Sequence, residues 1–279
     1  MNSGNTPHVR FAVLLITIFM FGSSLCPENK AQNQARSNEF CSDYNNYKND
    51  KVSFSEVREL TLPVANLLEV NGERNGGIRV KGDNRTNILV RACVRAQASS
   101  EEAAQSLARS VRVETSPVVR ATDVSAENSW TSVSYEILVP RQTDLKLTAN
   151  NGGIGISGVD GSIEFETANG GIHLSDVAGN VRGKTRNGGV HVTLSGNSWR
   201  GAGLDVETTN GGVHLNLPET YQARLETGTV NGGFKSEIPA LQVERKERER
   251  AVRLNTDFNG GGAPVRLITT NGGVKINSH

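Results

Sequence analysis

The chain has 279 residues and a formal net charge of +1 at pH 7, so neither sign of charge is in excess. A nucleic-acid partner normally requires a basic surface, and we therefore expect no nucleic acid among the partners. Aromatic residues make up only 5% of the chain. A folded core must then be built mainly from Val, Ile and Leu.

Residues 1–30 have the pattern of a secretory signal peptide or an N-terminal anchor. His8 and Arg10 precede an apolar run from Phe11 to Phe21, and small residues follow it. The run is shorter than the roughly 20 apolar residues that a membrane-spanning helix needs. A lipid anchor at Cys26 is disfavoured, because Leu25 is a poor residue for the lipobox position just before the cysteine. This segment is predicted to be membrane-targeted, and the rest of the chain to be exported to the periplasm or cell surface.

Residues 31–51 are rich in Asn, Gln, Lys and Ser, and they predict a polar linker. Loss of the signal peptide would leave two cysteines, Cys41 and Cys93. An even pair in an oxidising compartment is a candidate disulfide, and the alternative is two independent thiols. Cys93 falls on the polar face of a predicted strand, where Cys41 could reach it.

The stretch 52–147 is predicted to be an irregular, mainly β part of the fold. Short alternating segments predict strands over residues 67–70, 77–81, 88–94 and 130–139. One short helix is predicted near 100–109, where Ser99 and Glu102 have the spacing of a capping box.

The tripeptide Asn-Gly-Gly occurs eight times and is the most informative pattern. The copies begin at Asn75, Asn151, Asn169, Asn187, Asn210, Asn231, Asn259 and Asn271. The steps from Asn151 to Asn169 and on to Asn187 are both 18 residues. A fixed period with one turn per repeat is typical of stacked-repeat proteins. The pattern predicts an all-β fold, a single-chain β-solenoid over 52–279 that is most regular over 148–238.

Each Asn-Gly-Gly corner is predicted to be held by a ladder of Thr and Asn side chains. The Thr comes two residues before the Asn, so strand alternation assigns both residues to the inner face. The glycine pair is expected to supply positive φ angles. An inward Asn could bond the turn and the Asn of the next coil, since buried polar groups need partners. The predicted ladder comprises Thr167, Asn169, Thr185, Asn187, Thr208, Asn210, Thr229 and Asn231.

Antiparallel hairpins are the alternative, because Asn-Gly between alternating strands is also a strong hairpin signal. The outward charges favour parallel stacking, since they alternate in sign from one coil to the next. One position carries Glu164, Arg182 and Asp205, and another carries Glu166, Lys184 and Glu207. Parallel register would turn these into cross-strand ion pairs.

Residues 239–279 are predicted to cap the solenoid. The mixed-charge run 244–250 reads as a solvated loop or an edge strand. The copies at Asn259 and Asn271 are expected to finish the stack.

The Thr-x-Asn-Gly-Gly repeats, the segment Trp130–Pro140 and the N-terminal pattern together resemble a bacterial β-strand-repeat domain family of unknown function. That family is often labelled adhesin-like and is related to the adhesin-head solenoid domains. The resemblance covers 52–276. It implies a β-helix-like solenoid in the cell envelope, and it supplies no agreed activity and no catalytic motif.

The sequence contains none of the common nucleophile, zinc-protease or phosphate-loop motifs. We therefore predict no enzyme activity, no catalytic residues and no cofactor. The predicted function is an exported binding or scaffolding module whose partner is an envelope protein or a surface glycan. The alternative is a glycan-active solenoid enzyme, a polysaccharide lyase or hydrolase, which would need clustered carboxylates.

Three histidines recur at one offset after the corner: His173, His191 and His214. A histidine ladder could bind a transition metal. The alternative is that these are ordinary exposed strand residues, in a column that also holds Gly155, Lys235 and Lys275. Because the column contains no carboxylate, the sequence predicts exposed histidines that hold no metal.

Overall fold

The computed structural model describes residues 1, 40–41, 51–243 and 251–279. The predicted signal peptide, most of the predicted linker and the charged run 244–250 lie outside the described residues. The chain divides into two units, 1–36 and 37–279, and the second is described here. None of the helices in the described part is long and apolar enough to cross a membrane.

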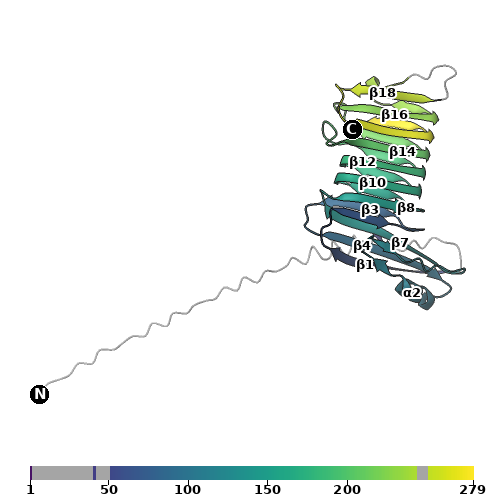
Figure 1. The fold of residues 1–279 in the computed structure, drawn as a ribbon. Helices are drawn as coiled ribbons and strands as arrows, with labels where there is room; N and C mark the ends of the chain where they lie inside the picture. The colour runs from purple at the N-terminus through teal and green to yellow at the C-terminus, as the bar shows by residue number, and fades with distance from the viewer. Residues whose placement is uncertain (2–39, 42–50, 244–250) are drawn as a thin grey trace. The chain divides into compact units, whose positions relative to one another are not determined.

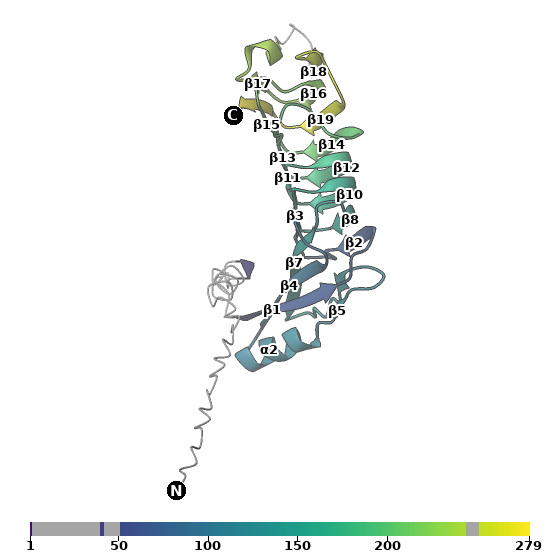
Figure 2. The same cartoon turned by 90° about the vertical axis from the view of Figure 1, so that its left-hand side faces the viewer.

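Two main β-sheets make up this unit, and they lie face to face (Figures 1 and 2). The first sheet has ten strands. In spatial order they are β1 (Val52–Leu62), β4 (Ile88–Ala98), β7 (Trp130–Pro140), β3 (Ile78–Asp83), β9 (Ile154–Ser157), β11 (Ile172–Ser175), β13 (Val190–Thr193), β15 (Val213–Leu217), β20 (Val274–Ser278) and β17 (Phe234–Ser236).

The second sheet has eight strands. Its order is β18 (Val252–Phe258), β16 (Ala223–Asn231), β19 (Pro264–Asn271), β14 (Gly203–Asn210), β12 (Ala178–Asn187), β10 (Asp160–Asn169), β8 (Asp144–Ala149) and β2 (Leu67–Asn71). A two-stranded ribbon pairs β5 (Val113–Glu114) with β6 (Arg120–Ala121). The strands therefore confirm the predicted all-β, solenoid-like fold.

Each coil passes from the eight-stranded sheet, through an Asn-Gly-Gly corner, into the ten-stranded sheet. Neighbouring coils pair in parallel, with Asn169 opposite Asn187 and Asn187 opposite Asn210. In the other sheet the same coils place His173 opposite His191. The 18-residue step is thus one full coil, and the antiparallel alternative is wrong for these strands.

Antiparallel pairing occurs at the two ends. The pairs β1–β4 and β4–β7 extend the ten-stranded sheet at one end, and β18 pairs with β16 at the other. Each sheet therefore has one antiparallel edge strand, β1 in the ten-stranded sheet and β18 in the eight-stranded sheet, and parallel strands in its middle.

The order of the C-terminal coils corrects the sequence prediction. The coil of β19 and β20 does not finish the stack, because β19 pairs with both β14 and β16, and β20 with both β15 and β17. The last coil in sequence therefore lies between two earlier ones. The copy at Asn259 forms no coil corner: Asn259 has φ of 50° and follows β18 in a glycine-rich turn.

The predicted helix is present as α2 (Glu101–Ser110), packed against β1 and β4. Its N-cap is Ser100, whose side chain accepts the Ala103 N–H, so the predicted capping box at Ser99 is wrong by one residue. At the other end, Arg58 of β1 donates to the Ala108 carbonyl at 2.8 Å. The same carbonyl also accepts the Val111 N–H at 3.1 Å, so it has two donors at the end of the helix.

Inward side chains of both sheets form one continuous aliphatic core. One column of this core runs Leu147, Phe165, Gly183, Val206 across adjacent strands. A Cβ atom on Gly183 would lie 1.9 Å from the Phe165 ring. The Phe165 ring therefore occupies the space that a side chain at position 183 would need.

Cys41 and Cys93 form a disulfide whose Cα atoms are 5.5 Å apart. Cys93 shares a face of β4 with Arg91 and Arg95, as predicted, and its side chain is fully buried there. The segment at Phe40 and Cys41 covers this face of β4. The Ser55 hydroxyl donates to the Cys41 carbonyl at 3.2 Å, and Arg95 donates to the Phe40 carbonyl at 3.3 Å.

Candidate binding face

The threonines of the corner ladder point inward and hold the coils together. Thr167 donates to the Gly152 carbonyl at 2.8 Å, Thr185 to Gly170 at 2.9 Å and Thr208 to Gly188 at 2.8 Å. Each acceptor is the first glycine of the preceding corner. Thr229 is also buried, but among the described residues its hydroxyl has no hydrogen-bond partner.

The asparagines of the ladder stack as well, but they are exposed, so their inward assignment is wrong. The Asn187 amide donates to Asn169 at 2.7 Å, and Asn210 donates to Asn187 at 2.8 Å. Asn231 joins the same row through Asn271, at 2.8 Å. Each of these asparagines ends its strand, and the chain turns there, so the strict alternation that buries the threonine no longer applies.

The corner glycines are needed for close approach, and the positive φ expected of them is not found. None of the glycines in the corners from Gly152 to Gly212 has a φ in the left-handed region. A Cβ on Gly170 would lie 2.1 Å from the Gly152 carbonyl oxygen, and one on Gly188 would lie 2.0 Å from Gly170. Any side chain at the first glycine would therefore force adjacent coils apart.

The outward face of the eight-stranded sheet consists of charges that pair with one another. Lys146 bonds Glu69 at 2.9 Å, and Lys184 approaches Glu166 at 3.3 Å. Arg266 of the inserted coil bonds Asp205 at 2.6 Å. These bonds join neighbouring strands, whereas Glu164 and Arg182, which are opposite each other on the same face, form no ion pair among the described residues.

The outward face of the ten-stranded sheet is different between β9 and β20. We call this surface the histidine face. It carries no carboxylate: its outward residues are Gly155, Ser157, His173, Ser175, His191, Thr193, His214, Asn216, Lys275 and Asn277. Two straight columns result, one with the imidazoles and Lys275, the other with hydroxyl and amide groups.

The three imidazoles stack along the sheet. Ring centroids are 4.8 Å apart for His173 and His191, and 4.6 Å apart for His191 and His214, with 11° between planes in each pair. Each ring lies back over the second glycine of its own corner; the Nε2 atom of His191 is 3.4 Å from where a Cβ of Gly189 would be. Burial lowers the pKa of His191 below 6.5, and the two neighbouring imidazoles lower it further.

A transition metal does not fit between the stacked rings. Imidazole nitrogens bind zinc at about 2.0–2.1 Å with lone pairs that lie in the ring plane. Nearly parallel rings more than 4.5 Å apart cannot aim two such lone pairs at one ion. Within the described residues, no group of three or more His, Cys, Asp or Glu side chains could hold a metal.

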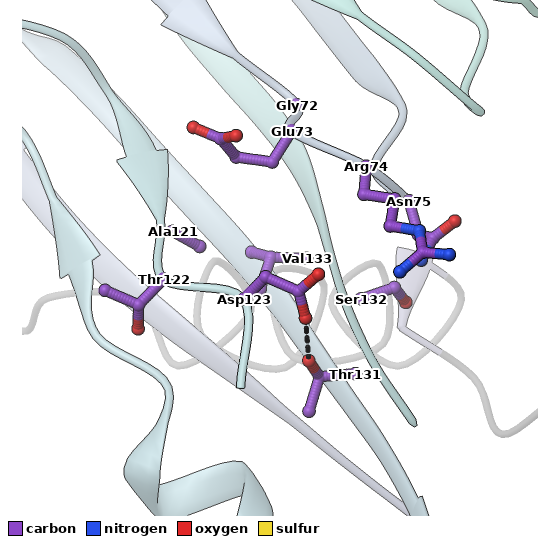
Figure 3. Close-up of a pocket in the computed structure, with 10 residues that line it drawn as sticks. All are labelled: Gly72, Glu73, Arg74, Asn75, Ala121, Thr122, Asp123, Thr131, Ser132 and Val133. Atoms are coloured by element: carbon purple, nitrogen blue, oxygen red, sulfur yellow. Dashed lines mark hydrogen bonds between the residues drawn. The ribbon is translucent and has the colours of Figure 1, made fainter. Parts of the chain in front are cut away.

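A small hollow lies beside the first corner, lined by residues 72–75, 121–123 and 131–133 (Figure 3). Its volume is about 20 Å³, which is room for roughly one water molecule. The pKa of the Asp123 carboxyl is lowered chiefly by the Ser125 side chain, then by the Ser125 N–H, which donates at 2.9 Å, and by Thr131, which donates at 3.3 Å. The hollow is too small for a sugar, and one hydrogen bond, between Thr131 and Asp123, joins side chains that line it (Figure 3).

Sequence reasoning found the histidine column but missed its surroundings. The Ser157, Ser175, Thr193, Asn216 and Asn277 column lies beside it and is visible as a polar residue two positions after each histidine or its equivalent. Arg79, four residues after Asn75, stands in line with the histidines through Gly155. The residues between β3 and β9 interrupt the repeat, so the sequence spacing does not show that Arg79 is equivalent to the histidines.

Comparison with known proteins matches residues 57–277 to the model of the Toastrack DUF4097 family. Two solved structures are similar. One is described as a "putative cell adhesion protein" from Clostridium sporogenes, with 12% identity, TM-score 0.39 and coverage of 80% of this chain and 100% of that one. The other is a "putative adhesin" from Bacteroides fragilis, with 10% identity, TM-score 0.39 and coverage of 81% and 97%. No curated protein matches the chain.

Proposed function

The chain belongs to the Toastrack DUF4097 family, and from that premise we propose that it is an exported, non-enzymatic module that binds an envelope protein or surface glycan through the histidine face. The two stacked sheets serve as the rigid support. The ligand contacts side chains that successive coils present at the same position.

The contrast between the two sheet faces carries this proposal. On the eight-stranded sheet, charges such as Lys146 and Arg266 are already bonded to carboxylates of neighbouring strands. On the histidine face, hydroxyl, amide and imidazole groups stand in rows with no carboxylate among them. Polar groups held in fixed register on a rigid sheet cost little ordering entropy when a ligand arrives.

Export is supported by two features. The first is the apolar N-terminal run from Phe11 to Phe21, which lies outside the described residues. The second is the Cys41–Cys93 disulfide, because disulfides persist mainly in oxidising compartments. Sequencing the N-terminus of the protein recovered from the periplasm or cell surface would test this part. Recovery of the whole chain from the cytosol would contradict it.

Site-specific photo-crosslinking in whole cells tests which face binds. A crosslinking residue at Ser175 probes the exposed histidine face, and one at Lys184 is the matched control on the opposite face. We expect one discrete envelope product from position 175 and little from position 184. Equal labelling from both positions would refute the assignment. Shortening of added polysaccharides by the purified protein would instead support the enzyme alternative.

A further inference from the structure

The stacked imidazoles offer their edges to a ligand. Their faces cover one another at centroid spacings of 4.8 and 4.6 Å. No hydrogen bond joins the ring nitrogens of His173, His191 or His214 to any described residue. The middle ring, His191, is therefore covered on both faces, and a protonated imidazole can donate from both nitrogens along its edge.

The charges around the column favour an anion when the imidazoles are protonated. His214 is opposite Lys275, which is opposite Lys235, and Arg79 stands at the other end beyond Gly155. Acidic groups lie at the margins of the column, and at the Arg79 end Glu136 is 4.0 Å from Arg79 and 2.9 Å from Arg91. Glu237 is 3.8 Å from Lys275, and Asp176 follows β11, where it accepts from Ser195 at 2.9 Å and is 3.9 Å from Arg141.

We infer that the histidine face binds a linear polyuronate, a glycan with one carboxylate per sugar, when the imidazole column is protonated. The inference rests on the proposed binding function and names its ligand class. Cations repeat along the column at the strand spacing of about 4.8 Å. A polyuronate laid along the column carries one carboxylate per sugar, so several of its carboxylates can reach the protonated imidazoles and Lys275 at once.

The second column explains why a glycan fits better than other anions. Asn216 and Asn277 bond each other at 2.8 Å, and Asn216 approaches the Thr193 hydroxyl at 3.4 Å. The Ser175 and Thr193 hydroxyls and the Asn216 amide can exchange hydrogen bonds with sugar hydroxyls beside the carboxylates, whereas the Asn277 Oδ1 atom is buried. The outward residues of the histidine face include no exposed large hydrophobic side chain that would favour a membrane surface.

Binding should couple to proton uptake. Burial and the two neighbouring imidazoles lower the pKa of His191, so the middle ring of the column is uncharged near neutral pH and gains its proton only in more acidic solution. An anion that prefers the charged column binds more tightly there and in turn stabilises the protonated form. Affinity should fall again only near about pH 4, where the uronate carboxyls themselves become protonated.

Titration calorimetry of the full exported protein with oligogalacturonate tests this at constant ionic strength. We expect affinity to be at least about tenfold higher near pH 5 than near pH 7.5. Replacing His173, His191 and His214 with Asn should reduce that gain to less than about twofold. His279→Asn is the matched control, since His279 lies outside the column and should leave the gain unchanged. Circular dichroism at both pH values shows that each variant is folded.

Three results would overturn the inference. They are an affinity that does not change with pH, equal binding of neutral cellohexaose, and equal binding of double-stranded DNA. None of these would affect the face preference measured by crosslinking. Crosslinks from Ser175 without acid-dependent polyuronate binding would therefore leave the proposed function in place and remove only its ligand class. Loss of crosslinking would refute the function itself.

Discussion

At the first glycine of each corner, the missing side chain is what lets successive coils approach. The carbonyl of that glycine accepts the threonine hydroxyl of the next coil and also faces the next glycine. Gly152 shows both contacts, to the Thr167 hydroxyl at 2.8 Å and to the space where a Gly170 side chain would begin. One residue type thus serves hydrogen bonding and packing together.

We predict that Gly188→Ala destabilises the fold far more than Gly189→Ala. The new Cβ at 188 would lie 2.0 Å from a backbone oxygen, whereas at 189 the nearest atom is 3.4 Å away. The first change should lower the free energy of unfolding by roughly 2–4 kcal/mol and the second by less than about 1 kcal/mol. Urea unfolding of both variants provides the measurement. Similar midpoints would show that the coils can separate without cost.

We also predict that the free energy of unfolding decreases as the pH decreases, because His191 resists protonation in the folded protein. Because the pKa of His191 is lower in the folded protein than its ordinary 6.5, the unfolded chain binds more protons in this range. The contribution of His191 to the free energy of unfolding is complete above about pH 6.5. It is lost as the pH falls from there through the lowered pKa of the folded protein. Urea titrations of His191→Asn should show a shallower pH dependence than those of His279→Asn. Identical slopes would contradict the stacked column.

At the scale of the element, each corner combines an inner and an outer ladder. The inner threonines bond backbone carbonyls, and the outer asparagines bond one another across coils. Asn187 takes part in two such bonds, to Asn169 and from Asn210. Because these amides are exposed, they compete with water, and each contributes less than a buried bond would.

We predict that Asn187→Leu destabilises more than Arg186→Leu, because Asn187 belongs to the outer ladder of asparagines. The first variant loses both amide bonds, which should cost about 0.5–1.5 kcal/mol. Arg186 is exposed on the same corner and serves as the control. Thermal melts of the two variants give the comparison. A larger effect at position 186 would mean that the exposed amides contribute nothing.

At the scale of the whole unit, the unusual feature is the inserted C-terminal coil. Its strand β19 separates β14 from β16, and its strand β20 separates β15 from β17. The coil that ends the chain is therefore an interior layer with a neighbour on each side. The edge of the eight-stranded sheet is formed instead by the antiparallel strand β18.

We predict that deleting residues 264–279, which removes β19 and β20, also unfolds the coil formed by β16 and β17. Without β19 and β20, the strands β16, β17 and β18 lose their pairing to the rest of the stack. Hydrogen exchange should show loss of protection in β16 while β10 and β12 stay protected. Val252→Asp, which disturbs only the edge strand β18, is the control. Continued protection of β16 would mean that it can pair directly with β14.

Local pattern determined the repeating parts of this protein. The 18-residue step set the parallel register, strand alternation buried Thr167 and Thr185, and the offset from the corner aligned the histidines. Each of these depends on one coil meeting an identical neighbour, and such contacts are encoded within each repeat. The fold class could be predicted from the sequence for the same reason.

Tertiary structure alone decided the parts where unlike segments meet. The threonine is buried and the asparagine exposed because the chain bends between them as it enters the corner. The Asn271 coil lies between those of Asn210 and Asn231 because the returning chain pairs with both. Cys93 is buried because residues 40–41 cross over β4. No local periodicity records these contacts, since each arises from strands that are distant in sequence and occur only once.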